Sequence, residues 1–222
     1  MIYIVSFLIL TYCFFISLLI IGIYKCSKTQ EYNHAELPNI TIIIPFRNEE
    51  KNIGKLLRSI SQLNYPKEKL EIITINDSST DNSIAEIKSF QNAMLPATLK
   101  IIELQDVSHT NYGKKSAVNY GIQIAKSEII VSTDADCIVY PNWINSLLAY
   151  LPPQTMLVCG PVRYNDNNST WSKLLQLEFF SLIFSGAASI GIKKPSFCNA
   201  ANMMFRKNIY LEVFDKFGKN YS

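Results

Sequence analysis

Short apolar runs alternate along this chain with segments in which apolar residues recur at helical spacing. The runs are continuous and rich in β-branched residues, which predicts strands buried on both faces. They cover residues 40–44, 71–75, 100–104 and 128–132. The segments between them predict helices over residues 52–62, 84–90 and 115–125. Strands alternating with helices indicate βαβ units, so we expect an α/β fold with a mostly parallel central sheet flanked by helices.

The pattern is looser after Tyr150. Residues 157–160 predict another strand, residues 197–205 a strand or close-packed loop, and a helix is expected from Lys207 onward. Residues 171–190 form a long, mostly apolar helical stretch. This composition favours a core helix over one in a membrane interface or along a channel. Trp143 and Trp171 are likewise interpreted as packing residues.

The N-terminal stretch, residues 2–24, contains no charged side chain. As a helix it is long enough to cross a hydrocarbon core of about 30 Å. Lys25 and Lys28 follow it at once, which predicts a cytoplasmic C-terminal flank by the positive-inside rule. The alternative, a cleaved signal peptide, lacks a basic start and a small-residue cleavage site at Gly22-Ile23-Tyr24. We expect a single-pass anchor in the cell membrane over residues 1–24, a linker over 25–39, and a cytoplasmic domain over 40–222.

Polar clusters follow three of the predicted strands, at residues 45–50, 76–81 and 133–136. Carboxyl ends of parallel strands meet at one edge of a sheet, so these clusters should line one crevice. Asp134 and Asp136 would point to the same side of an extended segment. Such paired carboxylates suit Mg²⁺ or Mn²⁺ that completes its shell with a ligand's phosphates. The alternative is a strand-end turn whose aspartates cap a helix beginning near Pro141.

Composition removes several classes of function. The net charge of +3, without a Lys/Arg run longer than two residues, argues against nucleic acid as a partner. Five cysteines without a Cys-x-x-Cys pattern fit neither a zinc site nor a disulfide framework and indicate a reducing compartment. Only two histidines are present, which disfavours a Ser-His-Asp triad. The first polar cluster lacks glycine, which disfavours a dinucleotide-binding site and a nucleotidyltransferase, and an aspartyl-nucleophile phosphatase would carry its Asp-x-Asp after the first strand.

Four motifs in this order resemble the family-2 glycosyltransferases, inverting enzymes with the Rossmann-like GT-A fold. They are Ile42-Ile43-Ile44-Pro45-Phe46-Arg47-Asn48-Glu49, Asn76-Asp77-Ser78-Ser79-Thr80-Asp81, Gly113-Lys114 with Asn119, and Thr133-Asp134-Ala135-Asp136. The segment Asn199-Ala200-Ala201-Asn202-Met203-Met204-Phe205-Arg206 also resembles the acceptor-side block of these enzymes. The resemblance spans residues 40–217. It implies a nucleotide-binding part over about residues 40–140 and a partial acceptor-side part over about 141–222.

The resemblance also implies roles for individual residues. Asp77 would accept from the base of a uridine nucleotide, in a pocket shaped by Pro45, Phe46 and Arg47. Glu49 would hold the first loop near the ribose, Lys114 would lie against the nucleotide or diphosphate, and Asp134 would sit by the ribose. Asp136 would bind the metal.

Alternative interpretations stay open at single positions. Asp77 and Asp81 suit a turn and a helix cap, Lys114 suits solvent, and Glu49 suits a helix N-terminus. Two residues depart from the family pattern: Arg47 stands where an aromatic residue is frequent, and Asn76 replaces a frequent aspartate.

The expected function is therefore that of a hexosyltransferase-type enzyme using a nucleotide sugar, in particular a UDP-sugar, with Mg²⁺ or Mn²⁺. Its acceptor would be a lipid or a glycan at the membrane. The resemblance places the acidic general base beyond Ser222, so the catalytic residues are not identified and transfer by these 222 residues alone is left open. The alternative is a non-catalytic nucleotide-sugar-binding module, or an inactive fragment of a longer glycosyltransferase.

Overall fold

The computed structural model describes residues 2–27, 31–91, 97–106, 113–164 and 169–217. The chain divides into two compact units. The helical unit consists of Met1–Glu31 and Pro161–Asn199, and the sheet unit of Tyr32–Gly160 and Ala200–Ser222. Residues 161–199, which the sequence analysis assigned to the cytoplasmic domain, thus cluster with the N-terminal helix.

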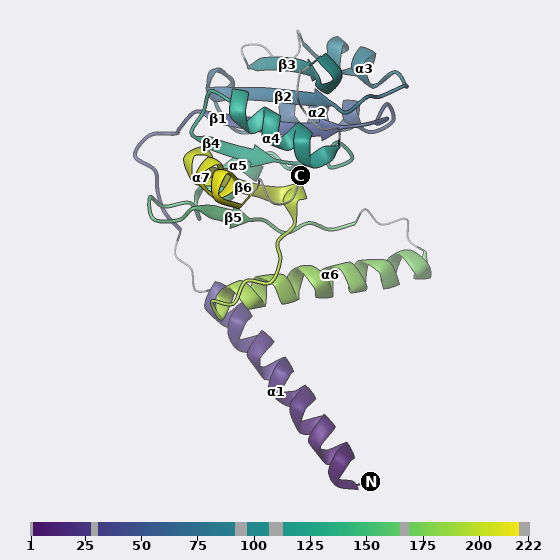
Figure 1. The fold of residues 1–222 in the computed structure, drawn as a ribbon, viewed down its shortest axis with the longest axis vertical. Helices are drawn as coiled ribbons and strands as arrows, with labels where there is room; N and C mark the ends of the chain where they lie inside the picture. The colour runs from purple at the N-terminus through teal and green to yellow at the C-terminus, as the bar shows by residue number, and fades with distance from the viewer. Residues whose placement is uncertain (1, 28–30, 92–96, 107–112, 165–168, 218–222) are drawn as a thin grey trace. The chain divides into compact units, whose positions relative to one another are not determined.

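The sheet unit is built on six strands in the order β3-β2-β1-β4-β6-β5 (Figure 1). Their bounds are β1 Ile40–Phe46, β2 Leu70–Asn76, β3 Thr98–Glu103, β4 Ile129–Ser132, β5 Leu157–Cys159 and β6 Met203–Arg206. Strands β1 to β4 pair in parallel, whereas β6 pairs antiparallel with both β4 and β5. The expected mostly parallel sheet is confirmed. The reversal at β6 brings the residues that precede it to the edge where β1, β2 and β4 end.

Helices cover both faces of this sheet. The unit contains α2 Ile53–Ser61, α3 Ser83–Ser89, α4 Lys114–Ile124, α5 Trp143–Leu148 and α7 Lys207–Phe217, with short 3₁₀ turns η1 Lys67–Lys69, η2 Leu104–Asp106 and η3 Ala200–Asn202. Ile42 and Ile44 of β1 pack in one core cluster with α2 and α5, whereas Ile43 packs in a second cluster with α4. Successive residues of a strand point to opposite faces, and helices cover both faces here. All three side chains are therefore fully buried. The continuous β-branched run is therefore the signature of a doubly covered strand.

A buried carboxylate joins the amino ends of the central strands. Glu71 of β2 accepts hydrogen bonds from the Thr41 hydroxyl at 2.7 Å and the Lys126 N–H at 2.9 Å, and it pairs with the Lys100 Nζ at 2.7 Å. Burial by itself would raise the pKa of Glu71, but these hydrogen bonds and the charge of Lys100 hold it below its ordinary value. The ionised form is therefore the one that the fold stabilises.

Replacing Glu71 by glutamine should lower the free energy of unfolding at neutral pH by about 2 kcal/mol, because a buried set of donors loses its charged acceptor. A lowered pKa means that this stabilisation is present above the unfolded-state pKa and is lost as the pH falls through the folded-state value. The difference between wild type and Glu71→Gln should thus shrink in acid. Urea unfolding of the detergent-solubilised chain at several pH values measures it, with the exposed Glu68→Gln as control. A difference that does not change with pH would contradict the assignment.

The helical unit contains α1 Ile2–Ser27 and α6 Thr170–Gly191. Both are long and apolar enough to cross a membrane by length and composition. Most side chains of α6 are exposed or half-buried, so the interpretation of this helix as part of a core is wrong. Trp171 is 70% exposed, whereas Trp143 of α5 is buried as expected of a packing residue.

Candidate donor-binding site

The candidate site lies at the carboxyl edge of the sheet, where the chain leaves β1, β2 and β4. Strand β1 stands between β2 and β4, so the strand order switches direction at β1. Open α/β sheets bind ligands at such a point. The Asp77 N–H donates to the Phe46 carbonyl at 2.9 Å, and the Thr133 N–H donates to the Ile43 carbonyl at 3.2 Å. The first bond holds the loop after β2 against the end of β1, and the second holds the start of the loop after β4 against the middle of β1.

A hollow of about 240 Å³ opens at this edge. The residues that line it are Pro45, Phe46, Arg47, Glu49, Asp77, Lys114, Asp134, Ala135 and Asp136. Every site residue nominated from the sequence therefore lies at the same hollow. They come from three strand ends and the first residue of α4, positions far apart in the sequence.

Lys114 and Asp134 face each other in this hollow. The Lys114 Nζ lies 2.7 Å from the Asp134 Oδ1, with side chains 59% and 29% exposed. Lys114 begins α4 directly after Gly113, whose φ of +112° favours glycine over residues with a Cβ. An ion pair this exposed contributes little to stability. Its significance is that it places an ammonium group in the hollow that Asp134 and Asp136 also line.

Asp77 is buried and joins two of the loops. Its Oδ1 accepts a hydrogen bond from the Gly113 N–H at 2.9 Å, and this bond fixes the backbone directly before Lys114. Asp81 instead accepts from the Glu50 N–H at 3.0 Å and the Ser83 N–H at 3.1 Å. Desolvation would raise the pKa of Asp81, but the hydrogen bond that the Ser83 hydroxyl donates to it, together with these two N–H bonds, holds that pKa below its ordinary value. Asp81 therefore has the local turn role weighed from the sequence, outside the lining of the hollow.

Hydrogen bonds between side chain and backbone connect the loop of residues 47–50 with the loop of residues 77–83; we call these the stitched loops. The Asn48 N–H donates to the Ser79 Oγ at 3.0 Å, and the Glu49 N–H donates to the Ser83 Oγ at 2.8 Å. In return the Thr80 N–H donates to the Asn48 Oδ1 at 2.8 Å. Sequence reasoning nominated none of Asn48, Ser79 or Ser83. The signal that could have found them is the density of Asn, Asp and Ser after two adjacent strands.

The Asp-x-Asp segment differs from the expected extended conformation. The Cys137 N–H donates to the Asp134 carbonyl at 3.2 Å, so the chain turns here. Both carboxylates reach the hollow through that turn, while Ala135 between them is buried. The position before α5 is taken by Asn142, so neither aspartate is the N-cap of that helix. The extended geometry predicted for Asp134 and Asp136 is therefore wrong. Both residues nevertheless line the same hollow.

The carboxylates of Asp134 and Asp136 are oxygen ligands of the kind that Mg²⁺ and Mn²⁺ prefer. Among the described residues, no group of three or more His, Cys, Asp or Glu side chains gathers to hold a metal by itself. Two carboxylates in an open hollow suit a cation that takes its other ligands from water and phosphate. The donor set therefore fits a diphosphate-bound ion.

The acceptor-side segment is anchored near the same edge. The Asn202 Oδ1 accepts a hydrogen bond from the Trp143 Nε1 at 2.8 Å, and its carbonyl accepts from the Gly160 N–H at 2.9 Å. Met203 pairs with Ser132 in the sheet register, so Asn202 arrives beside the loop that carries Asp134.

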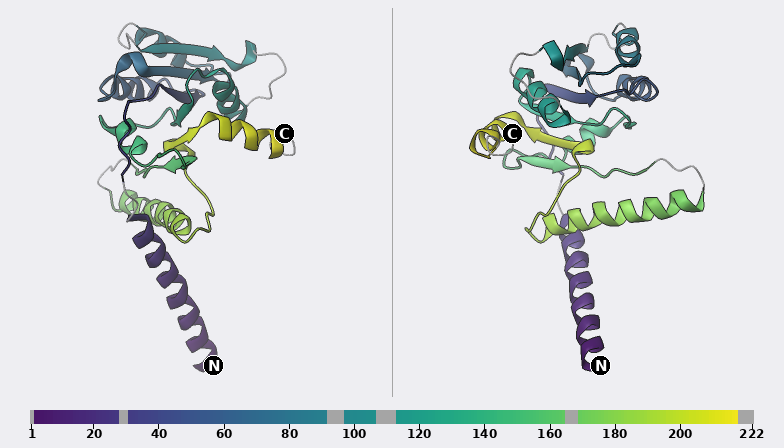
Figure 2. Two further views of the ribbon diagram at one scale, coloured as in Figure 1. Left: turned by 90° about the vertical axis from the view of Figure 1, so that its left-hand side faces the viewer. Right: turned by 45° about the vertical axis from the view of Figure 1, so that its right-hand side comes forward.

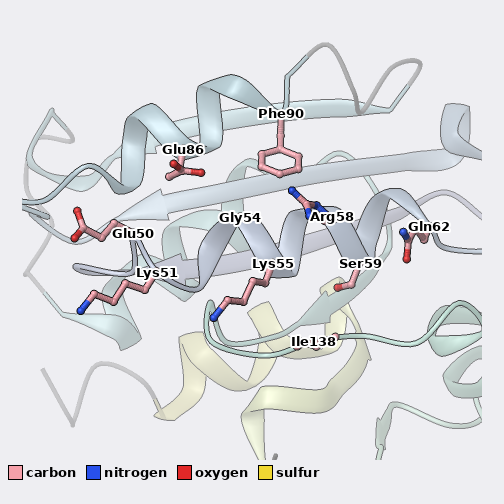
Figure 3. Close-up of a pocket in the computed structure, with 10 residues that line it drawn as sticks. All are labelled: Glu50, Lys51, Gly54, Lys55, Arg58, Ser59, Gln62, Glu86, Phe90 and Ile138. Atoms are coloured by element: carbon pink, nitrogen blue, oxygen red, sulfur yellow. The ribbon is translucent and has the colours of Figure 1, made fainter.

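A larger hollow of about 420 Å³ lies elsewhere on the sheet unit, on the surface formed by α2 and α3 (Figure 3). Its lining includes Lys51, Lys55 and Arg58, and also the acidic Glu50 and Glu86. It contains none of the nominated site residues, and its mixed charges give no single ligand chemistry. The hollow at the strand ends is the better candidate.

Comparisons of sequence give one consistent family. The family model described as Glycosyl transferase family 2 matches residues 41–214. Poly-beta-1,6-N-acetyl-D-glucosamine synthase of Staphylococcus aureus (strain COL) is 32% identical over 165 residues, which are 72% of this chain and 37% of that protein. Probable glycosyltransferase YdaM of Bacillus subtilis (strain 168) is 34% identical over 104 residues, 47% of this chain and 24% of that protein. The chain thus spans well under half the length of these curated relatives.

Comparisons of structure agree on the fold. Mannosyltransferase PcManGT from Pyrobaculum calidifontis, solved with GDP-Man and Mn²⁺, matches with a TM-score of 0.67 and 20% identity over 93% of this chain and 56% of its own. Glucosyl-3-phosphoglycerate synthase from Mycobacterium tuberculosis, solved with UDP, matches with a TM-score of 0.52 and 17% identity over 85% of this chain and 73% of its own. At this identity the matches show a shared fold only.

Proposed function

Since the chain belongs to glycosyltransferase family 2, we propose that it binds a UDP-sugar together with Mg²⁺ or Mn²⁺ and transfers the sugar with inversion. The acceptor is a lipid or a glycan at the cytoplasmic face of the cell membrane, and α1 is the anchor. The family and the GT-A fold expected from the four motifs are confirmed. The donor, the stereochemistry, the acceptor and the membrane face belong to the proposal.

The observation that supports the proposal is the single hollow that gathers Asp77, Lys114, Asp134 and Asp136. Asp77 accepts a hydrogen bond from the base, and Pro45 shapes the pocket around it. Asp134 lies by the ribose, and Asp136 holds the cation. When bound, the cation offsets the charge that develops on the leaving diphosphate.

Lys114 changes partners in this proposal. In the structure its ammonium pairs with Asp134 at 2.7 Å, which balances part of the negative charge of the hollow. A bound diphosphate and its cation bring a negative and a positive charge into the hollow, so Lys114 and Asp134 no longer depend on each other for a partner. The Lys114 ammonium is then available to the diphosphate as a flexible point charge. The pair therefore offsets the charge of Asp134 until a donor binds.

Donor binding is tested by a screen for protection against thermal unfolding. UDP-sugars with Mn²⁺ should stabilise the chain, by about 2.7 kcal/mol when the ligand is present at 100 times its Kd. GDP-mannose at the same concentration is the matched control and should protect less. Equal protection by both nucleotides would contradict the uridine assignment, and protection by neither would contradict the site.

The anchor is tested by placing charge in the middle of α1. Arginine at the centre of a membrane span costs about 2.5–3.5 kcal/mol. The double variant Leu10→Arg and Phe14→Arg should therefore lose most of its resistance to alkaline extraction from membranes, and Cys13→Ala is the matched control. Unchanged extraction of the double variant would contradict the anchoring role of α1.

A further inference from the structure

Helix α6 presents large apolar side chains to its surroundings along most of its length. Trp171 near its start is 70% exposed, Leu177 is 64% exposed and Phe180 near its middle is 62% exposed. Leu174, Leu175, Leu182, Phe184 and Ile190 are exposed as well. A helix of a water-soluble domain would turn such residues inward. This surface needs an apolar partner.

Within the helical unit, α6 contacts α1 closely at one place. A Cβ on Gly22 of α1 would collide with the Ala188 backbone of α6, and a Cβ on Gly191 would collide with the Gly22 carbonyl. The Cys26 thiol donates to the Ala187 carbonyl at 3.1 Å. All these residues lie in the C-terminal parts of the two helices, while side chains of α1 from Ile2 to Ile21 are largely exposed. The two helices cross there, and Figure 2 shows α6 leading away crosswise instead of running along α1.

The crossing lies at a defined depth if α1 spans the bilayer. From Ile2 to Ile21 the helix rises about 30 Å, which is the thickness of the hydrocarbon core. Gly22 then lies at the boundary between acyl chains and headgroups. A helix that crosses α1 at Gly22 and leads away from it stays at that depth.

Cationic side chains lie at the same crossing. Lys25 follows Gly22 by about one turn of α1. Lys193 and Lys194 follow the end of α6, where Lys193 has a φ of +59° and its N–H donates to the Ile190 carbonyl at 2.9 Å. All three lysines are exposed. Lysines at this level are complementary to anionic headgroups.

We propose that α6 lies in the plane of the cytoplasmic leaflet, at the boundary of headgroups and acyl chains, with its exposed apolar side chains in lipid. The inference rests on the proposed anchoring by α1 and adds a second membrane contact to it. After Gly191 the chain would then leave the bilayer surface and reach η3 in the acceptor-side segment.

Depth-dependent quenching of tryptophan fluorescence tests the inference on the full chain in vesicles of phosphatidylcholine and phosphatidylglycerol. The probe is Phe180→Trp in a Trp171→Phe background, which places an indole in the middle of α6. Trp171→Phe alone supplies the baseline from the buried Trp143. Tyr12→Trp in the same background is the matched deep reference, because Tyr12 is 66% exposed in the middle of α1.

Lipid brominated close to the headgroup should quench the Phe180→Trp probe about twofold more strongly than lipid brominated close to the methyl ends, and the Tyr12→Trp reference should show the opposite order. Stronger quenching by the deep lipid would mean that α6 spans the bilayer, and no quenching by either would place α6 against protein or in water; each result overturns the inference. A chain that does not float with vesicles would contradict the proposed anchoring by α1. The thermal-shift screen measures donor binding, and its result does not depend on the position of α1 or of α6.

Discussion

Replacing Asp136 by alanine is expected to abolish the Mn²⁺-dependent part of UDP binding. Asp134 and Asp136 line the hollow, and in the proposed complex Asp136 would hold the cation and so favour binding of the negatively charged diphosphate. Losing one charged ligand corresponds to about 2–3 kcal/mol, so the Kd for UDP with Mn²⁺ should rise about 30- to 150-fold. Without a divalent cation, wild type and variant should bind UDP with similar, weak affinity. Calorimetric titration with and without Mn²⁺ measures both.

Two controls separate a lost ligand from a lost charge or a disturbed loop. Asp215→Ala removes the same charge from an exposed position on α7. Asn142→Ala changes the end of the same segment, where Asn142 accepts a hydrogen bond from the Asn64 amide at 2.8 Å. Both should keep the Mn²⁺ dependence of wild type. If Asp136→Ala behaved as these controls do, the Asp-x-Asp segment would be a turn without a metal-binding role.

The second large effect is expected for Asp77→Asn. Asparagine retains an oxygen for the Gly113 N–H, so the loop before α4 should keep its conformation. The variant, however, turns an amide donor toward the N–H of the uracil base, where the carboxylate accepted a hydrogen bond. We expect UDP affinity to fall about 10- to 100-fold with little change in the melting temperature.

Glu68→Gln, which removes an exposed charge from η1 at the opposite edge of the sheet, is the matched control. Comparison of UDP with GDP isolates the base, because both share the ribose and the diphosphate. The loss should be confined to UDP. An equal loss for both nucleotides would mean that Asp77 acts only through the loop it fixes.

The sheet and its ligand-binding edge could be predicted from the sequence because β1, β2 and β4 are buried on both faces. A doubly covered strand must be apolar at every position, so the run from Ile40 to Ile44 identifies it without knowledge of its neighbours. The polar residue that ends each run then marks the edge of the sheet. Because β1, β2 and β4 are neighbours in the sheet, Asp77, Lys114 and Asp136 meet at that edge.

The features that sequence reasoning missed depend on long-range contacts. The turn at Asp134 follows from the packing of Ala135 into the core, which the residue pattern alone does not fix. The antiparallel β6 depends on its partners β4 and β5, because a run such as Met203–Arg206 has no intrinsic direction. For α6, the apolar composition was evident, but a core helix and a membrane-contacting helix have the same composition. Only the exposed fraction of its side chains distinguishes them.

The stitched loops bear on how quickly a donor can bind. The amide hydrogens of Asn48, Glu49 and Glu50 are held by side chains of the neighbouring loop, so their exchange with deuterium should report loop opening and not unfolding of the sheet. Loops already fixed by such bonds leave little conformational entropy to be lost when a ligand arrives. Association would then be limited by diffusion into the hollow, and differences in affinity among donors would appear mainly in their dissociation rates.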